Sequence, residues 1–265
     1  MGTYLAEVFN VIYLGRGEIK PEKQIGTIKV DDGTTSHYLY KVNDVDMSRP
    51  SIQPGDELIL TGPNVRLISS DGPLEIDFDL FDSDYKDSIC YECYPCNPRL
   101  KNKPIEKRII SKDGTGEILV LYSLFYNSVE AHLKIKLLTN DNSATANLHG
   151  VIAASISDID RPAFSSMLYL KKPGYGINLG CGDHIPLSRS IVAVPYGSML
   201  FLDFHLVTGD DDIVEGYLEF NVKPSDELVK SFSGKKGELV ASVTFVDELD
   251  DDGSEDESND DGSED

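Results

Sequence analysis

The sequence has no apolar run near the roughly 20 residues that a membrane-spanning helix needs. Its first residues, MGTYLAEVFNVIYLGRG, also lack the basic start and the continuous apolar core of a secretory signal peptide. These two absences exclude a helical membrane protein and favour an intracellular one. We therefore expect a protein of the cytoplasm, the nucleus or both, neither secreted nor bound to a membrane.

Cysteine is scarce, and three of the four cysteines lie close together in SICYECYPCNP (88–98). An intracellular address disfavours disulfides. Cys90, Cys93 and Cys96 have part of the spacing of metal ligands, and Cys181 and His184 in CGDH could complete a tetrahedral zinc site. The alternative is loop thiols without metal, because Tyr-Glu and Tyr-Pro separate the cysteines where zinc knuckles usually carry glycine. We expect no cofactor, with zinc as the alternative.

Basic residues are absent from the last 19 positions, DELDDDGSEDESNDDGSED (247–265), which hold 12 acidic ones. They carry 12 of the 22 net negative charges and leave the rest of the chain at about −10. Such a segment cannot bury a core and is expected to be disordered. This charge disfavours direct binding of nucleic acids and makes basic proteins, such as histones or ribosomal proteins, the natural partners. A solubilising tail without a specific partner is the other interpretation.

Helical patterning is nearly absent, and the hydrophobic period is two. In SVEAHLKIKLL (128–138) apolar and polar residues alternate, as in a half-buried strand, and PLEIDFDLFD (73–82) alternates in the same way. Only SDELVKSF (225–232) suggests a helical turn. The pattern predicts an all-β, antiparallel β-sandwich over 1–246. Further strands are predicted at 4–14, 24–31, 36–43, 57–61, 64–69, 117–125, 147–156, 166–171, 190–195, 199–208, 214–222 and 238–246.

The chain also resembles itself. NVRLISSDGPLEIDFDLFDSD (64–84) aligns without a gap on SIVAVPYGSMLFLDFHLVTGD (190–210), and IGTIKV (25–30) resembles HGVIAA (149–154), as YLYK (38–41) resembles LYLK (168–171). We therefore expect two similar packed β units, over 1–82 and 116–246, joined by the Cys- and Pro-rich stretch 83–115. The alternative is that any two period-two segments look alike.

An acidic series runs from a predicted strand into a loop, where β-sandwiches can build calcium sites from carboxylate oxygens. The other interpretation is a solvated strand face. No nucleophile–base pattern is present, and we identify no catalytic residues. The calcium candidates are Asp77, Asp79, Asp82 and Asp84.

Four segments together resemble the plant domain of unknown function 6598, a family abundant in grasses: DELILTGPNVRLISSDGPLEIDFDL (56–80), NSVEAHLKIKLL (127–138), LHGVIAASI (148–156) and LSRSIVAVPYGSMLFLDF (187–204). No catalytic residues are established for that family. Some members are fused to, or classed with, jasmonate-induced ribosome-inactivating proteins, so the resemblance implies plant stress or defence. The chain lacks the tryptophan and the active-site helix of the depurinating enzymes.

These observations favour a non-catalytic, intracellular protein-interaction module acting in plant stress or defence. The alternative is an rRNA N-glycosylase or a partner domain of one. A third interpretation, a histone-chaperone-like protein, depends on the acidic tail alone.

Overall fold

The computed structural model describes residues 3–15, 17–20, 24–44, 51–72, 74–80, 83–90, 102–110, 116–140, 145–159, 161–208, 211–223 and 227–247. Every regular element in these ranges is a β-strand, and every pairing is antiparallel, which confirms the predicted fold class. The strands are β1 (Thr3–Tyr13), β2 (Gly26–Asp31), β3 (Ser36–Val42), β4 (Glu57–Leu58), β5 (Ile68–Ser69), β6 (Leu74–Leu80), β7 (Ser83–Cys90), β8 (Pro104–Ile110), β9 (Glu117–Thr139), β10 (Thr145–Ile156), β11 (Ser166–Lys171), β12 (Ile177–Leu179), β13 (Ile191–Pro195), β14 (Met199–Thr208), β15 (Asp211–Asn221), β16 (Glu227–Ser233) and β17 (Gly237–Val246).

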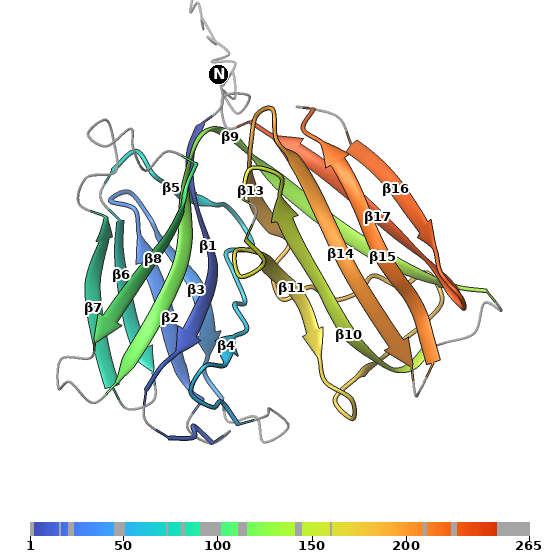
Figure 1. Ribbon diagram of the computed structural model, residues 1–265, viewed down its shortest axis with the longest axis horizontal. Coiled ribbons are helices and arrows are strands. Elements are labelled where there is room, and N and C mark those ends of the chain that lie inside the picture. Colours follow the sequence, from blue (N-terminus) through green and yellow to red (C-terminus); the bar gives the residue numbers. More distant parts are fainter. Residues whose placement is uncertain are drawn as a thin grey trace, which may run out of the picture.

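The strands form two sandwiches that lie side by side (Figure 1). In the first unit the sheet β3-β2-β6-β7 faces β8, the first half of β9, β1, β4 and β5. In the second unit the sheet β11-β10-β14-β15, with β12, faces β16, β17, the second half of β9 and β13. Each unit has its own hydrophobic core, filled by the inward residues of its alternating strands.

β9 belongs to both units. Its first half pairs with β1 and β8, and its second half pairs with β13 and β17. Asn127, which lies between the two halves, has a φ of 56°, a left-handed conformation that asparagine tolerates better than most residues. The strand rises through one unit and descends through the other (Figure 1). The two sandwiches are thus joined by a continuous strand.

The two units repeat the same topology. In the first, Ile28 of β2 pairs with Phe78 of β6, and in the second Ile152 of β10 pairs with Phe204 of β14. The sequence alignment matches the same phenylalanines. A break in register follows Ile28 in the β2–β3 pairing and Ile152 in the β10–β11 pairing. A shared register at this level of detail is hard to obtain from period-two similarity alone.

A pair of buried tyrosines marks the same correspondence. The Tyr40 hydroxyl donates to the Gln24 carbonyl, and the Tyr169 hydroxyl donates to the Leu148 carbonyl, both at 2.8 Å. Tyr40 is thereby equivalent to Tyr169, one position away from the alignment of YLYK with LYLK.

Two segments differ from the sequence interpretation. The stretch 83–115, expected to be a connector, contains β7 and β8 of the first unit, so the pairing changes between units within β9. The helical turn predicted over 225–232 is wrong. Residues 227–233 pair along their whole length with β17, and Phe232 packs edge-on against Phe204 at a ring separation of 5.4 Å. This packing favours the strand over the local helical signal.

Candidate functional site

The two units meet across a third hydrophobic cluster that includes Leu5, Phe9, Phe125 and Phe164. The aromatic rings contact edge to face, with Phe9 5.6 Å from Phe164 and 6.4 Å from Phe125. Polar groups are buried in the same interface. Asn10 Nδ2 donates to the Ala163 carbonyl at 2.7 Å. The units therefore pack as one body rather than as two beads on a linker.

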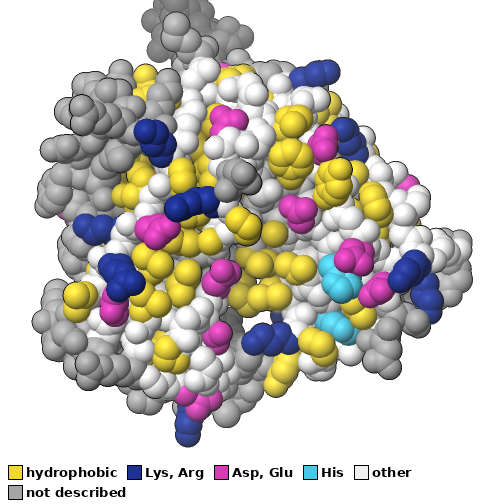
Figure 2. Space-filling view, viewed as in Figure 1, with side chains coloured by type: hydrophobic (Ala, Val, Ile, Leu, Met, Phe, Trp, Pro, Cys, Tyr) yellow, Lys and Arg dark blue, Asp and Glu magenta, His cyan; other side chains and the backbone are white. Residues whose placement is uncertain are grey.

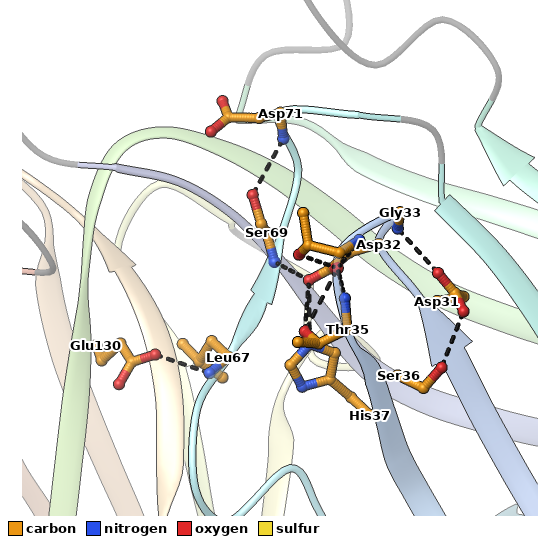
Figure 3. Close-up of polar contacts among 11 residues, drawn as sticks. Asp31, Asp32, Gly33, Thr35, Ser36, His37, Leu67, Ser69, Asp71 and Glu130 are labelled. Carbon is orange, nitrogen blue, oxygen red and sulfur yellow. Dashed lines mark hydrogen bonds and ion pairs between the residues drawn. The ribbon is translucent and has the colours of Figure 1, made fainter.

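Two buried glutamates link the units reciprocally. Glu7, on β1 of the first unit, accepts a hydrogen bond from the Ala193 amide of the second unit at 2.9 Å. Glu130, on β9 in the second unit, accepts one from the Leu67 amide of the first unit at 2.7 Å (Figure 3). Glu7 and Glu130 occupy equivalent positions in the repeat, as do Leu67 and Ala193. The two contacts therefore relate the units by an approximate twofold.

Only one of these glutamates faces a buried cation among the described residues. Arg189 Nη2 lies 2.8 Å from Glu7 Oε1, and both side chains are 1% exposed. Arg189 Nη1 donates to the Val8 carbonyl, and Ser166 Oγ donates to Glu7 at 2.6 Å. Burial lowers the pKa of Arg189, and the Glu7 charge opposes that shift. This ion pair fixes the entry to β13 against β1.

Beside this interface the two units leave a cleft with a volume of about 750 Å³. The first unit contributes Tyr40, the end of β3 and the segment around β4. The second contributes Tyr169, the end of β11 and the hairpin that leads to β12. In Figure 2 hydrophobic side chains gather in the hollow between the units, beside acidic and basic ones. The apolar lining comprises Tyr40, Ile52, Leu58, Ile59, Tyr169, Leu170, Tyr175 and Ile177.

Charges of opposite sign lie on the two walls. Asp56 and Glu57 line the wall of the first unit, and Lys171 and Lys172 line that of the second. Burial raises the pKa of the Glu57 carboxyl. Asp56 is engaged, because its Oδ2 accepts from the Gln53 amide. Within the described ranges the side chains of Glu57, Lys171 and Lys172 make no hydrogen bond or ion pair, so their charges are available to a ligand.

The glycine-rich stretch PGYGINLGCGD (173–183) forms part of this cleft. The Tyr175 amide donates to the Lys172 carbonyl, and Gly174 has a φ of 85°, which closes a tight turn. Tyr175 projects from the turn with 47% of its surface exposed. This is an aromatic contact residue that sequence reasoning missed, because the stretch looked like a plain connection. The signal for it was a single tyrosine between two glycines.

Figure 3 shows a polar network around Asp32 at the β2–β3 turn. Asp32 accepts from the Thr34, Thr35 and Ser69 amides, and its Oδ2 lies 3.0 Å from His37 Nε2. Burial favours a raised pKa for Asp32, but the bonds from Thr35, Thr34 and His37 outweigh it and hold the pKa far below its usual range.

This network is not a catalytic triad. Thr35 Oγ1 and Asp32 both contact Nε2 of His37, whereas a proton relay needs the two ring nitrogens to serve different partners. The Asp32 network instead fastens β5 to the β2–β3 turn.

The zinc candidates are not brought together by the described residues. Cys93 and Cys96 lie outside those residues. The backbone of Cys90 ends β7, at one end of the long axis of the molecule, whereas Cys181 lies beside the end of β9 at the other (Figure 1). The Thr139 amide donates to Cys181 Sγ at 3.3 Å, and His184 is exposed.

The calcium candidates lie on neighbouring strands. Asp77 and Asp79 are on β6, where Asp79 is exposed and pairs in register with Asp84 of β7. Asp82 lies outside the described residues. The structure thus places two of the four carboxylates on one strand face, and the site remains a prediction.

The segment VEAHLK (129–134) is part of β9 and not an active-site helix. Glu130 Oε1 is engaged by the Leu67 amide, and Oε2 lies 2.9 Å from His132 Nε2. No helix among the described residues is long and apolar enough to cross a membrane.

Together these features define a class: an all-β protein of two repeated antiparallel sandwiches with a mixed-charge, aromatic cleft between them. Residues 5–243 match the domain of unknown function DUF6598, and the chain belongs to that family.

No curated protein matches the chain. Among solved structures it is similar to the tandem C2 domains of extended synaptotagmin 2, at 8% identity and a TM-score of 0.29, over 92% of this chain and 90% of that one. It is also similar to human GIVD cytosolic phospholipase A2, at 11% identity and a TM-score of 0.23, over 92% of this chain and 33% of that one.

Proposed function

We propose that this protein is a non-catalytic protein-interaction module that binds basic partner proteins, and that the cleft between its two units is the recognition surface. The observation that carries the proposal is the pairing of an apolar, aromatic cleft with the charges of Glu57, Lys171 and Lys172 on its walls. The setting we propose is the cytoplasm or nucleus of a plant cell under stress or attack.

The cleft suits a polypeptide segment better than a small reacting substrate. Tyr175 and Ile59 are both partly exposed at its surface and offer apolar contact to an extended chain. Glu57 can accept from a lysine or arginine of that chain, while Lys171 and Lys172 can donate to its carbonyl or carboxylate oxygens. Aromatic and charged contacts of this kind carry most of the binding energy in protein interfaces.

The acidic residues 247–265 supply the long-range attraction. Twelve carboxylates in 19 residues create a field that draws basic proteins and that salt screens over about 8 Å at physiological ionic strength. The segment raises the rate of encounter, and the cleft provides the stereospecific contacts.

Binding of purified core histones and, separately, of total ribosomal proteins tests the proposal. Tyr175→Ala and Glu57→Gln are each expected to weaken binding about tenfold, the loss of one good interface contact. Tyr217→Ala and Glu219→Gln are matched controls, because both residues are exposed on β15 outside the cleft. Equal effects of cleft and control variants would overturn the proposal.

A further inference from the structure

We propose that His205, Asp212 and Glu215 form a binding site for a divalent transition-metal ion on the outer face of the second unit. Their ligand atoms, one from each residue, all lie within 4.8 Å of one another. An imidazole nitrogen with two carboxylate oxygens suits zinc and related ions. The site is separate from the cleft and from the cysteine cluster.

The strand pairing explains why these three side chains converge. His205 of β14 pairs directly with Glu215 of β15, so both point to the same face. The register then shifts, because Leu206 pairs with Val214 but Val207 pairs with Asp212, which leaves Ile213 as an extra residue. This bulge turns Asp212 onto the face that holds His205 and Glu215. Without it, Ile213 would occupy that position.

The contacts leave a place for a cation. His205 Nε2 lies 3.0 Å from Asp212 Oδ1, and a metal would replace the proton shared by these two atoms. Lys235 Nζ lies 3.0 Å from the other oxygen of Asp212, Oδ2, and can remain there. The hydrogen bonds from His205 and Lys235 lower the pKa of Asp212, which keeps it ionised as a metal ligand.

A cavity of about 320 Å³ adjoins the site. Asp212, Glu215, Phe232 and Lys235 are among its lining residues. The cavity gives room for water or for an oxygen ligand of a partner at the remaining coordination positions. Figure 2 shows histidine, acidic and basic side chains close together on this face of the second unit.

Zinc titration of the full chain by calorimetry tests the site. We expect His205→Gln to weaken zinc binding at least tenfold and Glu215→Gln to weaken it as well. Lys235→Gln should tighten it several-fold, because it removes a positive charge from beside the bound cation. A purely structural ion-pair cluster would not produce that gain.

The controls are His184→Gln and Cys181→Ser, which are expected to leave this binding unchanged. All altered residues are at least partly exposed, and circular dichroism checks that each variant folds. Zinc binding that persists in His205→Gln, or that is lost in Cys181→Ser, would overturn the proposal. So would an absence of any zinc binding by the full chain.

Discussion

Glu7 and Glu130 hold equivalent positions in the two units, and each accepts a hydrogen bond from a backbone amide of the other unit. The arrangement is reciprocal, as in a symmetric dimer interface, although both units belong to one chain. The cleft lies beside this interface, so its shape depends on the two glutamates and on Arg189.

The two glutamates differ in what they hold, and this gives a first prediction. Glu7→Gln should lower the free energy of unfolding by about 3–5 kcal/mol, because it leaves the buried Arg189 charge uncompensated. Glu130→Gln should cost about 1 kcal/mol, since its amide oxygen can still accept from Leu67. Urea denaturation measures both. The double variant Glu7→Gln with Arg189→Met should recover much of the loss, and no recovery would contradict the ion-pair argument.

Asp32 gives a prediction for pH. Its folded pKa lies below the unfolded value of about 3.9, so its carboxylate stabilises the fold above that pH, and the contribution is lost as the pH falls below it. Asp32→Ala should therefore cost about 3 kcal/mol at pH 7 and progressively less below about pH 4.

Denaturation of wild type and Asp32→Ala across this pH range measures the effect. Asp44→Ala is the control, because Asp44 is exposed and makes no contact with the described residues. A stability difference that stayed constant down to the acid limit would show that Asp32 does not titrate as argued.

The end of the folded body gives a third prediction. Asp247, which the sequence assigns to the acidic tail, is 9% exposed, and its Oδ2 accepts from the Tyr196 hydroxyl at 2.8 Å. Truncation after Leu249 should leave the melting temperature nearly unchanged, whereas truncation after Val246 should lower it. Asp247→Ala in the full chain separates the side chain from the new terminus, and equal melting temperatures for all three would contradict this contact.

Enzymatic activity gives the fourth prediction. The full-length protein should release no adenine from ribosomal RNA, because Glu130 is buried on a strand and engaged by Leu67 and His132. Incubation with ribosomes at sub-stoichiometric protein, followed by detection of abasic RNA, measures this. Specific depurination with turnover would support the glycosylase alternative.

Much of the fold was predictable because the inward and outward residues alternate so regularly. β1, β3, β11, β13, β14 and β17 lie within a residue or two of their predicted bounds. The repeat was also visible, since Phe78 and Phe204 align without a gap. β7 and β8 were missed, because cysteine, proline and charged residues in 83–115 hide the period of two. β16 was missed because its edge pairing depends on a distant strand.

The cleft could not be predicted from the sequence. Tyr40 and Tyr175 are far apart in the chain and come together only because the two units pack through Glu7, Glu130 and Arg189. The convergence of His205 with Asp212 depends on a single register shift that no local pattern reveals. Side chains that meet across sheets or at bulges leave no periodic signal.

The central claim is that the cleft between the units binds a basic partner protein. Hydrogen–deuterium exchange of the full chain, with and without purified core histones or total ribosomal proteins at low salt, tests it most directly. The account predicts protection of both walls, residues 51–61 and 169–177, which weakens as salt rises. Binding with protection confined to other surfaces, or no binding of either preparation, would contradict it.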